Sequence, residues 1–132
     1  MKITSNKIII NQPAEEIFSF LENLEHFEQL MPEQVINWQA TPETCSFTIK
    51  GMADISLQMN DKKQYSFICI SSVGKAPFDF NLNIYLETLS KSETEVFIDL
   101  DAKVSPMLAM MAKRPLQNLV NYMVEELLKY YQ

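Results

Sequence analysis

SPMLAMMAKRPLQNLVNYMVEELLKYYQ, residues 105–132, is the stretch that decides the fold of this chain. From Leu116 onward its apolar residues recur at helical spacing, at positions 116, 119, 120, 123, 124, 127 and 131. At about 100° per residue these positions form one broad apolar stripe. Ser105 and Pro106 are suited to the cap and the first turn of a helix. The stretch therefore predicts a long helix that lies with one side on an apolar surface.

The residues before this helix supply such a surface. Residues 3–11 predict an opening strand, and Pro13 marks the start of a helix whose apolar face includes Ile17 and Leu21. A second short helix is expected around Phe27 and Leu30, ending at Pro32. Beyond it, apolar and polar residues mostly alternate, which is typical of half-buried strands. We expect these strands at 35–40, 44–49, 54–59, 65–71, 78–87 and 96–102, with turns that include 60–63 and 90–93.

The order of these segments predicts the fold class. Short connections between the six later strands favour an antiparallel meander. With each strand apolar on one face, the sheet and the last helix can bury their apolar faces against each other. We therefore predict an α+β fold, a curved seven-stranded antiparallel sheet (β-α-α-β6-α) wrapped around a long C-terminal helix. Its 132 residues suffice for one domain, 1–132, with a substantial core.

Composition restricts the function classes. Seventeen acidic against eleven basic residues give a net charge of −6, which argues against nucleic-acid binding and disfavours docking on anionic lipid. No signal-peptide core and no apolar run of membrane-spanning length is present, so we expect a cytoplasmic protein without stable membrane insertion. Cys45 and Cys69 are expected to be buried thiols, with a disulfide or metal pair as the alternative.

The segment order, the stretch Pro13-Ala14-Glu15-Glu16-Ile17-Phe18 and the C-terminal helix together resemble the START/Bet v 1-like superfamily (SRPBCC, helix-grip fold). The resemblance covers essentially the whole chain but identifies no branch. It implies a helix-grip fold and functions such as apolar-ligand carriage, lipid transfer, polyketide cyclisation, quinone binding or assistance to chaperones. The chain departs from the plant allergen branch, because its two glycines, Gly51 and Gly74, cannot form that branch's glycine-rich loop. No catalytic residue transfers from the resemblance.

Turn positions suggest where a ligand would enter. Successive turns of a meander alternate between the two ends of the sheet, and this places the apolar turns near Pro32, Met52, Phe78 and Ser105 at one end. An apolar rim on a curved sheet is typical of a pocket mouth. The alternative is a fully packed core without a cavity. The predicted ligand-binding residues are Phe47, Ile49, Ile55, Leu57, Phe67, Phe80, Leu82, Leu108, Ala109, Ala112 and Leu116.

Methionines near the same end form a second candidate. If the helix is straight, Met107, Met110 and Met111 point away from its apolar stripe, with Met31 and Met52 nearby. Such a soft apolar patch suits a protein partner or a homodimer. Pro115 could instead kink the helix and turn these methionines into the pocket, and ordinary contacts with loops are the third possibility.

Polar candidates for chemistry are weak. His26, the only histidine, is expected in a structural role, and we expect no metal site and no cofactor. Asp99 and Asp101 are interpreted as a solvated outer face, with a paired-carboxylate acid/base site as the alternative. Trp38 and Tyr65 could place a polar tip in an apolar cavity or serve as structural aromatics.

The sequence thus predicts non-catalytic binding of a small apolar ligand that is lipid-, quinone- or polyketide-like. A protein-interaction or homodimer module that uses the methionine patch is the first alternative. A cyclase- or hydrolase-type enzyme is the second, and it would need polar groups converging inside the cavity.

Overall fold

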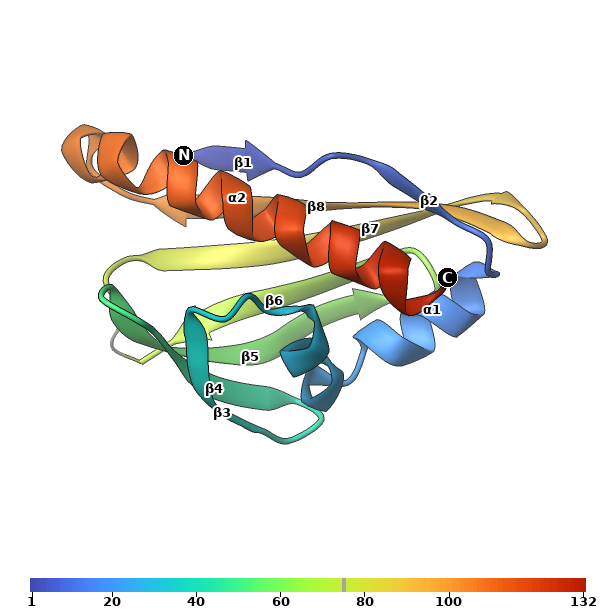
Figure 1. Cartoon of the computed structure of the whole chain (residues 1–132), viewed down its shortest axis with the longest axis horizontal. Helices are drawn as coiled ribbons and strands as arrows, with labels where there is room; N and C mark the ends of the chain where they lie inside the picture. The colour runs from blue at the N-terminus through green and yellow to red at the C-terminus, as the bar shows by residue number, and fades with distance from the viewer. Residues whose placement is uncertain (75) are drawn as a thin grey trace.

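The chain folds into a curved antiparallel sheet that packs on a long C-terminal helix (Figure 1). A computed structural model describes residues 1–74 and 76–132. The elements, in order, are β1 (Lys2–Thr4), β2 (Ile8–Ile10), α1 (Ala14–Leu21), the 3-10 helix η1 (Leu24–Leu30), β3 (Val35–Ala40), β4 (Thr44–Ile49), β5 (Ala53–Lys63), β6 (Phe67–Val73), β7 (Asp79–Ser90), β8 (Glu93–Lys103) and α2 (Pro106–Tyr130). The strand order is β1-β8-β7-β6-β5-β4-β3, and β2 also pairs with β8. The predicted fold class and meander are confirmed.

The opening strand is split, which the sequence did not predict. β1 and β2 both pair with β8, and Ser5 lies between them. The Ser5 side chain accepts a hydrogen bond from the backbone N–H of Ile98 at 2.8 Å, and the Ser5 N–H donates to the Ile98 carbonyl at 2.7 Å. Because the side chain replaces a backbone acceptor there, the regular ladder is interrupted while the backbone groups stay paired.

The turn expected at residues 60–63 lies four residues further on. β5 continues to Lys63 past an irregularity in pairing between Met59 and Asp61. The chain then reverses through residues 64–66, where Tyr65 has a φ of +63°. Polar residues suggested a turn at 60–63, but here they occupy the exposed end of a long strand.

Phe67 was wrongly assigned to the inner face. Its neighbour Ile68 is fully buried and pairs with Ile84, so Phe67 projects from the opposite, outer face of the sheet. There its ring contacts Tyr85 at a centroid distance of 5.2 Å, and Tyr85 stacks on Phe97 at 4.8 Å. The run from Phe67 to Ile70 is apolar throughout, so it carries no alternation from which to infer a face.

Asp99 also differs from its prediction as a solvated residue. Its 5% exposure reflects the pairing of β1 with β8. It accepts a hydrogen bond from the Thr4 hydroxyl at 2.8 Å and forms an ion pair with Lys2 at 3.5 Å. Asp101, by contrast, is exposed as expected. The carboxylate of Asp99 therefore ties the N-terminal strand to the sheet.

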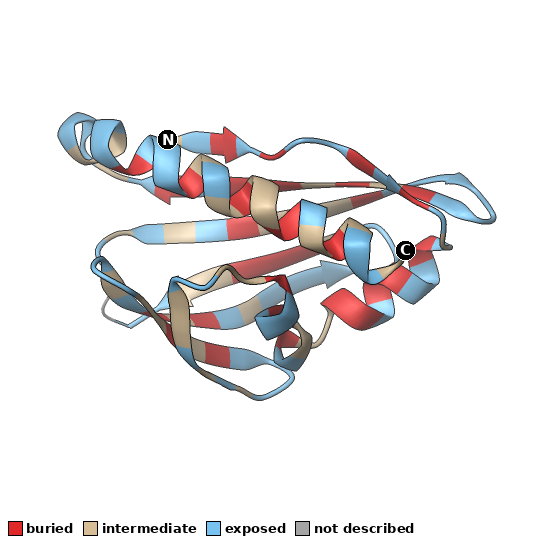
Figure 2. Cartoon of the chain, in the orientation of Figure 1, coloured by how far each residue is buried: buried red, intermediate tan, exposed pale blue. Residues whose placement is uncertain are grey.

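Helix α2 begins where the sequence predicted. The Ser105 hydroxyl accepts a hydrogen bond from the Leu108 N–H at 3.3 Å, and Pro115 lies inside the helix without ending it. The helix passes along β1, β2 and β8. Figure 2 shows its buried stripe turned toward the sheet and its other side exposed, and the buried residues are Ala112, Leu116, Val120, Met123, Val124 and Leu127.

Two further observations concern the cysteines and the helices. Cys45 and Cys69 are free and buried, which confirms the prediction of buried thiols. Within the described residues, the helices lack the length and apolar character needed to cross a bilayer.

Candidate functional site

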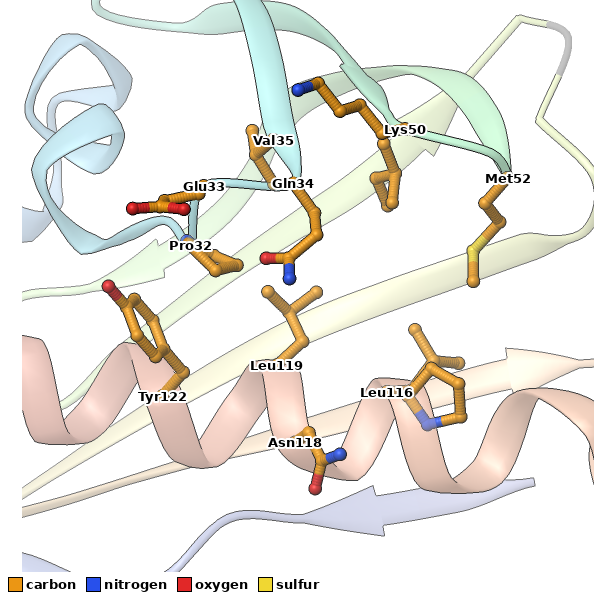
Figure 3. Close-up of a pocket in the computed structure, with 12 residues that line it drawn as sticks. Pro32, Glu33, Gln34, Val35, Lys50, Met52, Leu116, Asn118, Leu119 and Tyr122 are labelled. Carbon is orange, nitrogen blue, oxygen red and sulfur yellow. The ribbon is translucent and has the colours of Figure 1, made fainter.

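A cleft of about 690 Å³ lies between the middle of α2 and the strands β3 and β4 (Figure 3). One wall comes from α2. The other comes from the segment leading into β3 and from the turn between β4 and β5. The Lys50 N–H donates to the Gln34 carbonyl at 2.9 Å and so joins these two segments, while Gly51 closes the turn with a φ of +75°. The lining residues are Pro32, Glu33, Gln34, Val35, Ile49, Lys50, Met52, Pro115, Leu116, Asn118, Leu119 and Tyr122.

An apolar inner compartment adjoins this cleft in the space between α2 and the sheet. It shares Ile49, Met52, Leu116 and Leu119 with the cleft. Its own volume is only about 40 Å³, because the surrounding side chains nearly fill it. All fourteen lining residues are apolar: Met31, Phe47, Ile49, Met52, Ile55, Leu57, Pro77, Phe78, Phe80, Leu82, Leu100, Leu116, Leu119 and Met123.

Polar groups are confined to the outer cleft. Figure 3 shows the side chains of Gln34 and Leu119 pointing toward each other across it, while Asn118 points away. The pKa of the Tyr122 phenol is raised, mainly by desolvation and further by the carboxylate of Glu126. Tyr122 is therefore a neutral phenol at the cleft, able to donate a hydrogen bond.

The structure brings most of the predicted ligand-binding residues together. Phe47, Ile49, Ile55, Leu57, Phe80, Leu82 and Leu116 line the inner compartment. Phe67 does not, for the reason given above. Leu108, Ala109 and Ala112 border neither the cleft nor the compartment, and Ala112 is buried in the core. The space lies further along α2, at Leu116, Leu119 and Met123, because the first turns of the helix extend beyond the strands (Figure 1).

Sequence reasoning missed part of the lining. Leu119 and Met123 were not among the predicted ligand-binding residues, whereas they form part of the compartment wall. Leu100, on the apolar face of β8, and Phe78, directly before β7, were also missed as lining residues, although both continue the apolar half of an alternating pattern. That alternation was the available signal for both residues.

The methionines divide into two groups. Met31 and Met52 line the inner compartment. Met107, Met110 and Met111 are 76%, 84% and 72% exposed on the first turns of α2. The idea that Pro115 turns these three into the pocket is therefore wrong, because the helix continues through Pro115 and they remain outside.

The remaining polar candidates occupy structural positions. The His26 ring stacks on Phe20 at 4.7 Å, and its Nδ1 lies 2.7 Å from the Phe20 carbonyl oxygen. Trp38 stacks on Phe47 at 5.0 Å, and its buried Nε1–H has no hydrogen-bond partner among the described residues. Tyr65 lies in the β5–β6 turn, 38% exposed. Across residues 1–74 and 76–132, His, Cys, Asp and Glu do not gather in threes that could hold a metal ion.

Comparison with known proteins shows which solved structures share this fold. No protein-family model matches the sequence, and a search of curated proteins finds no match. A START superfamily protein from Mycobacterium smegmatis matches with a TM-score of 0.72 at 14% identity, over 98% of this chain and 96% of that chain. Truncated norcoclaurine synthase from Thalictrum flavum matches with a TM-score of 0.78 at 10% identity, over 98% and 92%. A hypothetical protein from Helicobacter pylori gives 0.73 at 12% identity, over 100% and 88%.

At sequence identities this low, the structural matches show the fold alone. The matches span nearly the whole chain, and they agree with the order of segments and with the sheet that curves around α2. The chain therefore has the START/Bet v 1-like, helix-grip fold.

Proposed function

We propose that this chain binds a small apolar ligand, lipid-, quinone- or polyketide-like, without transforming it. The observation that carries the proposal is that an open cleft shares lining residues with an inner compartment lined only by apolar side chains. Such sites hold ligands mainly by removing apolar surface from water. The fold is one that commonly binds hydrophobic ligands, which supports the proposal.

Area burial is sufficient for useful affinity. Removing about 400 Å² of combined apolar surface from water contributes ~10 kcal/mol at about 25 cal/mol per Å². Association costs offset a large part of this amount. The remainder corresponds to binding in roughly the micromolar to millimolar range. No charged contact is needed for such a complex.

The ligand would need more room than the compartment now has. Small-molecule sites usually measure about 300–1,000 Å³, so the 690 Å³ cleft is large enough and the 40 Å³ compartment is not. Met31, Met52 and Met123 line the compartment, and methionine side chains rearrange easily because they are unbranched. We expect the body of the ligand in the cleft and its apolar end among these methionines.

The cleft also offers a polar end to the site. Gln34 points into it, and its amide can both donate and accept hydrogen bonds. A ligand with one oxygen-bearing end and one apolar end would satisfy both parts. This pattern fits a fatty acid, a quinone or a polyketide better than a pure hydrocarbon.

The enzyme hypothesis has less support. General acid–base catalysis needs titratable groups within hydrogen-bond reach of the reacting atoms. The carboxylates of Asp99 and Asp101 lie on the outer face of β8, and the compartment lining is apolar. Glu33, Lys50 and Tyr122 line only the open cleft. We therefore favour binding over catalysis.

Native mass spectrometry of the protein purified from its own source tests the proposal. We expect a non-covalent adduct that is lost on denaturation. A Leu119→Trp variant should lose the adduct, because Leu119 lines both the cleft and the compartment and the larger side chain would occupy space in both. A wild-type protein that carries no adduct and takes up neither fatty acids nor quinones would contradict the proposal.

A further inference from the structure

The first turns of α2 carry an exposed apolar face that the ligand site does not use. Met107, Met110 and Met111 follow the i, i+3, i+4 spacing that places side chains on one side of a helix. Each is more than 70% exposed, while Leu108 and Ala109 between them are half-buried against the body. We call Met107, Met110 and Met111 the methionine tip.

Charge is distributed unevenly around this tip. Although the chain has a net charge of −6, residues 102–124 contain no acidic residue and three basic ones, Lys103, Lys113 and Arg114. No acidic residue occupies the first turn of α2, so nothing there offsets the positive end of the helix dipole. In the part of the chain that the structure describes, Lys113 and Arg114 form no ion pair.

The tip lies at one end of the molecule. In Figure 1 the first turns of α2 extend to the left beyond the strands, and Figure 2 shows them largely exposed. At a rise of about 1.5 Å per residue, Lys113 and Arg114 follow the methionines by about 3 to 10 Å along the helix axis. Helices at membrane interfaces bury their apolar face to about 5–10 Å, while their basic side chains reach the phosphates.

From these features we propose that the methionine tip docks on the surface of an anionic lipid bilayer. The methionines enter the boundary between headgroups and acyl chains, and Lys113 and Arg114 bind lipid phosphates. The net charge of the whole chain argued against anionic lipid, but charges more than about 10 Å from the surface are largely screened at physiological salt. The charges that act on the bilayer are therefore those of residues 102–124, which include no acidic residue.

A second copy of this chain fits the tip less well. A symmetric dimer through the methionines would bring two Lys113–Arg114 pairs close together, and like charges repel.

Nearby acids keep the lipid interaction weak and reversible. Asp79 is the register partner of Lys103, and Asp101 is exposed on the same strand.

The tip adjoins the ligand cleft. Pro115 and Leu116 line the cleft, about one helical turn after Met111. Docking would hold the cleft mouth close to the bilayer, so an apolar ligand could pass between lipid and protein with little exposure to water. This role in loading rests on the proposed function, whereas docking itself rests only on the tip and its charges.

Vesicle flotation tests the docking. Wild-type protein is mixed with phosphatidylcholine vesicles made with or without phosphatidylserine, at low and high salt. We expect flotation only with phosphatidylserine, and weaker flotation at high salt. A Met107→Gln/Met110→Gln/Met111→Gln variant and a Lys113→Gln/Arg114→Gln variant should each reduce partitioning about tenfold or more.

A matched control is Leu89→Gln, which removes an exposed apolar side chain (48%) from the β7–β8 hairpin at the other end of the strands and should float like wild type. Melting temperatures check that the variants fold, and ligand uptake in vesicle-free solution is measured for all of them. Normal flotation with no ligand uptake would overturn the proposed function alone. No flotation of the wild type, equal flotation of the methionine variant, or a wild-type dimer that this variant converts to monomer would overturn the docking proposal.

Discussion

Leu119→Asn should weaken ligand binding strongly while leaving the fold intact. Leu119 lines both the cleft and the inner compartment and is only half-buried, so replacing it removes less core packing than replacing a fully buried leucine would. A fully buried leucine contributes about 1.5–3 kcal/mol, and covering the exposed half with ligand contributes roughly 1 kcal/mol. A polar amide facing an apolar ligand costs about 1–2 kcal/mol more. The sum of about 2–3 kcal/mol predicts a Kd about 30- to 150-fold higher.

Trp38 supplies the assay. It is the only tryptophan, and its ring stacks on Phe47, which lines the inner compartment. A brominated fatty acid that enters the compartment should quench Trp38 fluorescence, and the titration gives the Kd. Leu128→Asn is the matched control, because Leu128 is also half-buried on α2 but borders neither the cleft nor the compartment.

Both substitutions exchange leucine for asparagine within one helix, so both carry a similar helix-propensity cost of about 0.5 kcal/mol. Their melting temperatures should therefore be similar. The reasoning is refuted if Leu119→Asn binds the fatty acid as wild type does, or if Leu128→Asn loses as much affinity.

Three further predictions concern stability. Met123→Ala should lower the free energy of unfolding by about 2–5 kcal/mol in urea titrations, because Met123 is 1% exposed and its loss enlarges the compartment; a loss below about 1 kcal/mol would mean that the site collapses. Asp99→Ala should cost about 1–3 kcal/mol by the same measurement, since the Thr4 hydroxyl and Lys2 lose their buried partner, and no loss would show that β1 is not held by this carboxylate. Burial raises the pKa of the Cys45 thiol from 9.0 to about 12; the unfolded state releases this proton first, so stability should fall as pH rises from 9.0 to about 12. The fall should be smaller in Cys45→Ala, and an equal fall in both proteins would contradict the assignment.

Periodicity was enough to predict the architecture. The helical spacing from Leu116 to Leu127 and the alternation in β7 and β8 each fix which side chains face inward, and the resulting layers match the structure. Phe67 shows where this logic fails, because a wholly apolar run gives both faces the same signal. Asp99 shows a second limit, since its burial depends on β1, a strand almost a hundred residues away in the sequence.

The position of the site required information that periodicity does not contain. The sequence correctly predicted that Ala112 lies on the inner side of α2. It did not predict the position of α2 across the sheet. The helix runs along β1, β2 and β8 but its first turns extend beyond the strands, so the space lies further along, at Leu116 to Met123. Lateral placement of a helix depends on the packing of many side chains at once, and a one-dimensional pattern does not encode it.

The methionine methyl groups test the central claim most directly, because the eight methionines sample both surfaces in question. In vesicle-free solution, a fatty acid is titrated into protein labelled with ¹³C at the methionine methyls, and each NMR signal is assigned by substitution. The ligand site described here predicts chemical-shift changes at Met31, Met52 and Met123, with Met107, Met110 and Met111 unchanged. Changes confined to Met107, Met110 and Met111 would contradict it and move the ligand to the outside of α2.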